Sequence, residues 1–105
     1  MSGNRGGSWI RPVRRWAIYL RDSRRTEGRR VLQCVYCQRS IEDLLADDLF
    51  LTLDHIKAGG SDAEWNLITA CWGCNNAKGT KSIKQFAADI GVPAPSIRRR
   101  LSLRR

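Results

Sequence analysis

The segment Leu51–Gly79 reads LTLDHIKAGGSDAEWNLITACWGCNNAKG and holds the most informative residues of the chain. Its first apolar run ends in Asp54-His55, and this histidine is the only one in the protein. A Gly-Gly pair follows, and a second apolar run starts at Asn66 and leads into a C-x-x-C pair and the sequence NNAKG. We expect two short strands joined by a loop and followed by a helix that ends at Gly79.

A second C-x-x-C pair lies upstream, so the chain has four cysteines that can act together: Cys34, Cys37, Cys71 and Cys74. A structural zinc ion takes four ligands at tetrahedral angles, and four thiolates close such a site. In an intracellular protein this pattern favours a metal over disulfides. The 33 residues between Cys37 and Cys71 contain the Asp-His pair, so the predicted zinc site would hold both ends of the hairpin region.

The charge of the chain is uneven. It has 105 residues and a formal net charge of +9. Residues 1–30 carry nine arginines against two acids, residues 31–77 carry two bases against seven acids, and residues 78–105 carry eight bases against one. An acidic centre between basic arms suits a cation site that is held against a polyanion, and we expect nucleic acid as the partner.

The compartment is predicted from missing signals. The first thirty residues lack the apolar segment of a signal peptide, and no apolar run approaches the roughly 18 residues of a membrane span. We therefore expect a cytoplasmic protein without membrane contact.

The organisation along the chain predicts one α+β domain. We expect disorder over residues 1–10, a folded domain over 11–92 with its core at 34–79, and a flexible basic tail over 93–105. Strands are expected at Leu49–Leu53 and Asn66–Ala70, and a short helix after Ser40.

Two longer helices are predicted from apolar residues at helical spacing. The first begins near Pro12 and buries a stripe formed by Val13, Trp16, Ala17 and Leu20. The second follows the capping box Ser82-x-x-Gln85 and buries Ile83, Phe86, Ala87 and Ile90. The arginines off the first stripe are either a solvated face or phosphate contacts, and residues 24–30 are expected to form an arginine-rich loop.

The central segment has the residues that phosphodiester hydrolysis requires. A histidine can act as a general base, because an imidazole pKa near 6.5 suits neutral pH. A divalent ion can neutralise the phosphoryl oxygens and assist the leaving group. Mg²⁺ prefers oxygen ligands and needs one or two protein groups, which Asp54 and Asn75 can supply. A lone Asp-His pair is weak evidence, but the pair between two C-x-x-C turns is much more specific.

These residues together resemble the HNH endonuclease family in its four-cysteine form, which is found in bacterial and phage members. The resemblance covers Cys34 to Gly79. It implies a small zinc-stabilised ββα-metal fold with flanking helices, with His55 as general base and Asp54 as a ligand of the catalytic metal. It further implies that Asn66 orders the hairpin, that Asn75 binds the metal, and that Lys78 faces a phosphate.

The resemblance is incomplete at one site position, because Asn75 stands where many members have a histidine. This variant favours Mg²⁺ or Mn²⁺ over softer ions. Because neighbouring strand residues point to opposite faces, we also expect the first strand to end, bulge or twist sharply at Asp54.

Two functions follow as alternatives. The favoured one is a metal-dependent DNA endonuclease or nicking enzyme acting on double-stranded DNA, in the host cytoplasm if the chain is phage-encoded. The other is a zinc-stabilised DNA-binding module without catalysis. Partners in phage packaging, restriction or homing all remain open. The residues expected to contact nucleic acid are Lys78, Arg14, Arg15, Arg21 and Lys81.

Overall fold

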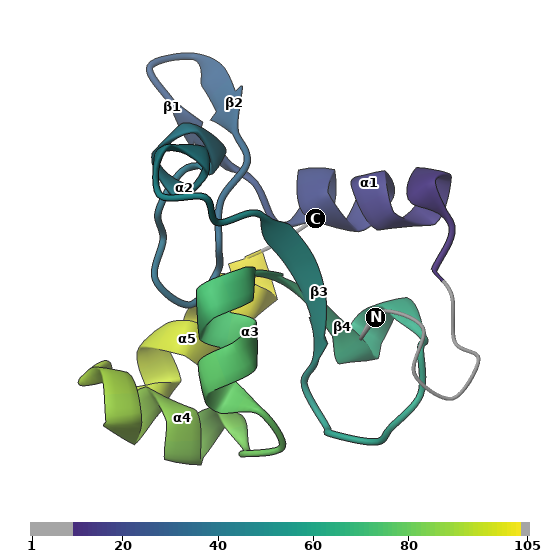
Figure 1. Ribbon diagram of the computed structural model, residues 1–105, viewed down its shortest axis with the longest axis vertical. Coiled ribbons are helices and arrows are strands. Elements are labelled where there is room, and N and C mark those ends of the chain that lie inside the picture. The colour runs from purple at the N-terminus through teal and green to yellow at the C-terminus, as the bar shows by residue number, and fades with distance from the viewer. Residues whose placement is uncertain (1–9, 104–105) are drawn as a thin grey trace.

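The protein combines helices with two small antiparallel sheets, which confirms the predicted α+β class (Figure 1). The computed structural model describes residues 10–103. The predicted disorder at 1–10 therefore lies outside the described residues, except at Ile10, which is buried in a small cluster. In chain order the elements are α1 (Pro12–Arg21), β1 (Arg24–Thr26), β2 (Arg29–Val31), α2 (Ile41–Ala46), β3 (Leu51–His55), the 3₁₀ turn η2 (Glu64–Asn66), β4 (Leu67–Cys71), α3 (Trp72–Lys78), α4 (Ile83–Ile90) and α5 (Ala94–Leu103).

The hairpin β3–β4 with helix α3 is the predicted ββα unit. The strands pair antiparallel from Leu51 opposite Cys71 to His55 opposite Leu67. Strand β3 starts two residues later than expected. The strand neither ends nor bulges at Asp54, because the ladder runs without interruption to His55 and ends there. Helix α3 begins directly after Cys71, whose sulfur accepts a hydrogen bond from Cys74 N, and ends at Gly79 with a φ of 55°.

Helix α1 packs against the free edge of β4 with a face that the sequence did not predict. Its buried residues are Ile18 and Tyr19, whereas Val13, Trp16 and Leu20 of the expected apolar stripe are exposed. The reason is that the outer edge of β4 presents unpaired backbone groups, which need polar partners. Asp22, the residue that follows the helix, accepts a hydrogen bond from Thr69 N at 2.9 Å, so the face of α1 that carries Ile18 and Tyr19 is turned to the strand.

Residues 24–31 form a two-stranded hairpin rather than the expected loop. Arg24 pairs with Val31 and Thr26 with Arg29. The two residues of the turn, Glu27 and Gly28, have φ values of 51° and 76°. A two-residue turn with both φ positive matches the right-handed twist of the strands, so this turn favours a hairpin.

The short helices begin at the caps that the sequence predicted. The side chain of Ser40 accepts a hydrogen bond from Asp43 N at the start of α2. The capping box of Ser82 and Gln85 is present at the start of α4, and Gly91 ends that helix in the left-handed conformation. These local hydrogen bonds satisfy backbone donors that helix ends leave unpaired.

The main core lies between the first C-x-x-C turn, β4, α4 and α5. The Tyr36 and Phe86 rings meet edge to face with centroids 5.1 Å apart. Ile83 and Ala87 are buried as predicted, whereas Ile90 is only partly buried.

The C-terminal segment is a helix where the sequence predicted a flexible arm. Ile97 of α5 is fully buried, and Arg100 donates to the carbonyl oxygens of Val35 at 2.8 Å and Tyr36 at 2.9 Å. Residues 94–103 therefore belong to the folded domain, while Arg104 and Arg105 lie outside the described residues. Within residues 10–103, none of the helices is both long and apolar enough to cross a bilayer.

Candidate active site and metal centre

The four cysteines meet in one cluster. Each is a free cysteine, and their sulfur atoms lie within 4.8 Å of one another. Cys37 Sγ and Cys71 Sγ are 4.0 Å apart. A tetrahedron with metal–sulfur bonds of about 2.3 Å has edges of about 3.8 Å, so the cluster has the dimensions of a four-sulfur metal site.

Both C-x-x-C turns have the same local geometry. The backbone N–H of Cys37 donates to Cys34 Sγ at 3.5 Å, and that of Cys74 donates to Cys71 Sγ at 3.4 Å. The first turn is also tied to the hairpin, because Val35 N donates to Thr69 O at 3.0 Å. Strand β4 therefore contacts both turns: Thr69 of β4 bonds to the first turn, and Cys71 at the end of β4 starts the second.

The thiols influence one another's ionisation. Hydrogen bonding with Cys34 lowers the pKa of Cys37 to about 7. Hydrogen bonds with Cys34, and then with Cys37 and Cys74, lower the pKa of Cys71 below its ordinary value. The same hydrogen bonds raise the pKa of Cys34 and Cys74, so the four thiols share their protons as one group; the thiolate is the form that binds metal.

Asp54 is buried and receives two hydrogen-bond donors at one oxygen. Tyr36 Oη donates to Asp54 Oδ2 at 2.6 Å, and Lys78 Nζ lies 3.1 Å from the same atom. Burial, and then the charge of Asp54, raises the pKa of Tyr36 well above its usual range, so the phenol remains a donor. Sequence reasoning missed Tyr36, because no pattern marks a residue inside a C-x-x-C turn as a partner of a distant carboxylate.

His55 lies at the end of β3 with its ring directed to the following loop. His55 Nε2 is 2.6 Å from Asp62 Oδ1, and a third of its side chain is exposed. The Arg14 guanidinium donates to the Asp62 carbonyl oxygen. Asp62 was also missed, since an acid seven residues after a histidine in a glycine-rich loop has no distinctive pattern.

Asn66 closes that loop from inside. It is fully buried, its Oδ1 accepts from Lys57 N at 2.9 Å, and its Nδ2 donates to Ser61 O at 2.8 Å. A Cβ at Gly60 would stand 2.9 Å from Asn66 Nδ2 and 2.8 Å from Lys57 O, so only glycine fits the loop there. This position fits the ordering role that the resemblance implies for the middle asparagine.

Asn75 extends from α3 to the backbone of β3. Its Nδ2 donates to Thr52 Oγ1 at 2.8 Å and to Leu53 O at 3.1 Å. Because both contacts use the amide nitrogen, the amide oxygen points elsewhere and remains an acceptor.

Lys78 occupies a different place from the one expected of a phosphate contact. Its side chain is fully buried, and Nζ donates to His55 O at 3.1 Å in addition to meeting Asp54. The cause is the buried Asp54 carboxylate, which requires a compensating charge. In this conformation Lys78 joins α3 to β3 and does not reach solvent.

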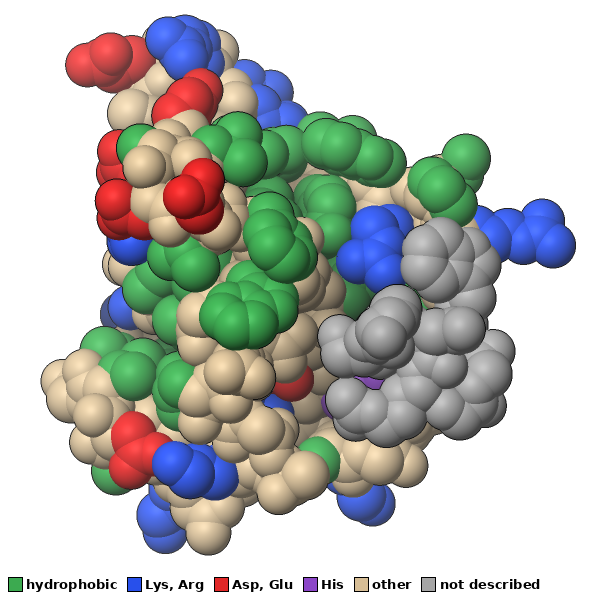
Figure 2. Space-filling model, viewed as in Figure 1, with side chains coloured by type: hydrophobic (Ala, Val, Ile, Leu, Met, Phe, Trp, Pro, Cys, Tyr) green, Lys and Arg blue, Asp and Glu red, His purple; other side chains and the backbone are tan. Residues whose placement is uncertain are grey.

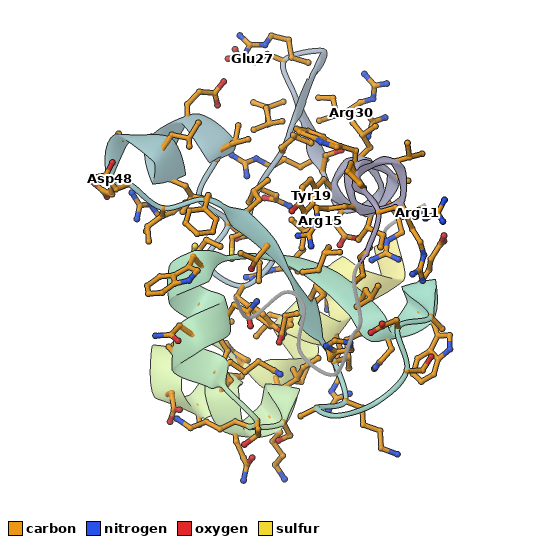
Figure 3. All side chains as sticks on the ribbon, turned by 45° about the vertical axis from the view of Figure 1, so that its right-hand side comes forward. Arg11, Arg15, Tyr19, Glu27, Arg30 and Asp48 are labelled. Atoms are coloured by element: carbon orange, nitrogen blue, oxygen red, sulfur yellow. The ribbon has the colours of Figure 1, made fainter. Side chains whose placement is uncertain are left out.

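The predicted arginine contacts are also engaged within the protein. Arg21 donates to Leu67 O at 2.6 Å and to Glu64 O at 2.8 Å, which docks α1 on β4. Arg15 Nη1 donates to Tyr19 Oη at 3.2 Å, and Figure 3 shows these two side chains close together. Of the five residues expected to bind nucleic acid, Lys81 is exposed, although it pairs with Asp89.

Comparison with known proteins agrees with this geometry. Residues 34–81, which span the two C-x-x-C turns, the hairpin and α3, match the family model described as HNH endonuclease. Neither the curated proteins nor the solved structures contain a match to the chain. The family acts on nucleic acid as nucleases, and its members use a divalent metal. Residues 34–81 are therefore identified as an HNH endonuclease domain, as the sequence resemblance implied.

Proposed function

We propose that the protein is a metal-dependent endonuclease that hydrolyses phosphodiester bonds of double-stranded DNA, either nicking or cutting it. In this proposal Asp54 and Asn75 bind one Mg²⁺ or Mn²⁺ ion, His55 is the general base, and the four cysteines hold a structural zinc ion.

The observation that carries the proposal is the set of side-chain contacts between α3 and β3. Lys78 Nζ contacts both His55 O and the Asp54 carboxylate, and Asn75 is bonded to Thr52 and Leu53, the two residues of β3 that precede Asp54. These contacts hold α3 against the part of β3 that carries Asp54 and His55, which supports the assignment of Asp54, His55 and Asn75 to one site.

The donor atoms fit a hard divalent cation. Asp54 offers a carboxylate, and the contacts of Asn75 Nδ2 with Thr52 and Leu53 turn its amide oxygen away from the strand. Mg²⁺ prefers such oxygen ligands and retains several water molecules. When bound, the cation neutralises the phosphoryl oxygens and stabilises the leaving oxygen.

His55 is proposed to accept the proton of the attacking water. Asp62 Oδ1, 2.6 Å from Nε2, is placed to accept the Nε2–H. That hydrogen bond leaves Nδ1 without a proton and therefore able to act as base. Asp62 thus sets the tautomer, and Asn66 holds the loop that carries Asp62.

Zinc is proposed for the cysteine cluster because four sulfur ligands at tetrahedral spacing leave no open position for substrate. The cluster would stabilise the fold, because the first C-x-x-C turn is hydrogen-bonded to β4 and the second forms the start of α3. The catalytic cation and the zinc ion would occupy separate sites.

Exposed basic side chains are proposed to bind the phosphate backbone. Lys57, Lys81 and Lys84 are exposed near the His55 end of the domain. The arginines of the β1–β2 hairpin lie at the other end of β3 (Figure 1). The acidic side chains of α2 also gather at that other end, away from His55 (Figure 2). Contacts to phosphate position a protein on DNA but carry little sequence information.

The test is the Mg²⁺ dependence of plasmid nicking by two matched variants. Asn75→Ala removes a proposed ligand, whereas Asn76→Ala removes the exposed neighbouring asparagine of the same helix. We expect Asn75→Ala to need a higher Mg²⁺ concentration for half-maximal nicking and Asn76→Ala to behave as the wild type. EDTA should abolish nicking by all three proteins.

Two results would contradict the proposal. Nicking that persists in EDTA would exclude a dissociable divalent metal as the catalyst. DNA binding by a well-folded wild-type protein without cleavage in Mg²⁺ or Mn²⁺ would instead favour the non-catalytic binding module.

A further inference from the structure

The Asp54 carboxylate is held from two sides at a single oxygen. Tyr36 Oη donates to Oδ2 at 2.6 Å, and Lys78 Nζ lies 3.1 Å from the same atom. Tyr36 and Lys78 are each 1% exposed, and the Asp54 side chain retains 6% exposure. Within residues 10–103, no hydrogen bond reaches Asp54 Oδ1.

Both donors are held by further contacts. The Tyr36 ring packs edge to face on Phe86 with centroids 5.1 Å apart, and the residue lies between the metal-site cysteines Cys34 and Cys37. Lys78 is fixed by its second bond to His55 O. Because Oδ2 has two buried donors, rotation of the Asp54 carboxylate would break both contacts in a buried environment, where lost partners are costly.

We infer that Tyr36 is a positioning residue of the catalytic carboxylate, which fixes Asp54 so that Oδ1 alone is presented to the divalent cation. This inference rests on the proposed function. It also gives the cysteine site a second role, because the turn that holds two of its sulfur atoms carries the hydroxyl that orients the catalytic ligand.

The expected effect is a loss of metal affinity without a loss of fold. Partners that orient metal ligands are typically worth about 10–100-fold in metal affinity or activity. Tyr36→Phe keeps the ring on Phe86 and removes only the hydroxyl, while Lys78 still compensates the Asp54 charge. We expect Mn²⁺ to bind this variant about tenfold more weakly, with zinc content and circular dichroism unchanged.

Tyr19→Phe is the matched control. Tyr19 is also buried and also donates a hydroxyl, but to the Leu51 carbonyl oxygen at 3.1 Å. Tyr36→Phe loses one buried hydrogen bond, and Tyr19→Phe loses one buried bond and the partly buried bond from Arg15, so a general loss of stability would affect the control at least as much. Mn²⁺ affinity, measured by calorimetry on full-length protein with its cysteine site loaded, should fall in Tyr36→Phe alone. At saturating Mg²⁺ the nicking rate of Tyr36→Phe should recover most of its loss.

An NMR measurement on the wild-type protein tests the same inference without a variant. The chain has two tyrosines, so tyrosine labelled with ¹³C at Cζ gives two resonances. Mg²⁺ should shift the Tyr36 resonance and leave that of Tyr19 in place. Equal Mn²⁺ affinity in wild type and Tyr36→Phe, or an unmoved Tyr36 resonance in a protein that nicks DNA, would overturn the inference. A wild-type protein that neither binds Mn²⁺ nor nicks DNA would instead refute the proposed function.

Discussion

Arg100 should be a structural residue, although it lies in a basic C-terminal segment. Its guanidinium donates two hydrogen bonds, to Val35 O at 2.8 Å and Tyr36 O at 2.9 Å, and so ties α5 to the first C-x-x-C turn. Hydrogen bonds from a charged group contribute about 1.5–3 kcal/mol each. Arg100→Met keeps the aliphatic stem and loses both, so we expect a loss of at least about 2 kcal/mol in the free energy of unfolding.

The assay is thermal unfolding followed by circular dichroism at equal metal loading. For a domain of this size a loss of 2 kcal/mol lowers the Tm by roughly 8–16 °C. Arg98→Met removes the same charge from an exposed position of the same helix and should leave the Tm close to that of the wild type. If both variants unfold at the same temperature, the hydrogen bonds to the turn do not stabilise the domain and the reasoning fails.

Cys71→Ser should lose the structural metal and unfold, because metal binding and folding are coupled; zinc found at one equivalent in a folded variant would contradict the assignment. Gly60→Ala should destabilise the loop between β3 and β4, since the added Cβ would stand within 3 Å of Asn66 Nδ2 and Lys57 O. Faster hydrogen exchange confined to residues 56–66 would show this, and exchange at the wild-type rate would refute it. Replacing Lys57 and Lys84 together with alanine should reduce the slope of log Kd against log salt by about two, at about 0.9 per phosphate contact. An unchanged slope would mean that these lysines do not contact the backbone.

The parts of the fold that were predictable from sequence are those set by nearby residues. The caps at Ser40 and Ser82 and the helix that follows Cys71 each depend on hydrogen bonds within a few residues. The four-cysteine cluster was predictable for a different reason. The chemistry of a tetrahedral thiolate site restricts which cysteine pairs can meet.

The parts that were not predictable depend on distant partners. The orientation of α1 depends on β4, because Asp22 at the end of the helix accepts a hydrogen bond from the backbone N–H of Thr69, which lies 47 residues away. The burial of Ile97 and the contacts of Arg100, up to 65 residues distant, turn an arginine-rich tail into a packed helix. Composition alone cannot distinguish such a helix from a solvated arm.

The candidate site shows the same division. Asp54, His55, Asn66 and Asn75 were identified from their conjunction in one segment. The contacts of the other site residues exist only in the folded chain. There the buried Asp54 carboxylate is paired with Tyr36 and Lys78, and the His55 imidazole is paired with Asp62. An end or bulge of β3 at Asp54 was wrongly expected, because the strand keeps its regular pairing through His55.

The most direct test of the central claim is the rate at which purified protein nicks supercoiled plasmid in Mg²⁺, compared between wild type and His55→Ala prepared in parallel with equal zinc content. General-base assistance contributes about 10²–10⁴ in rate. The account predicts a loss of that size in His55→Ala, with DNA binding and circular dichroism retained. Equal nicking rates for the two proteins would show that His55 is not the base and would contradict the account.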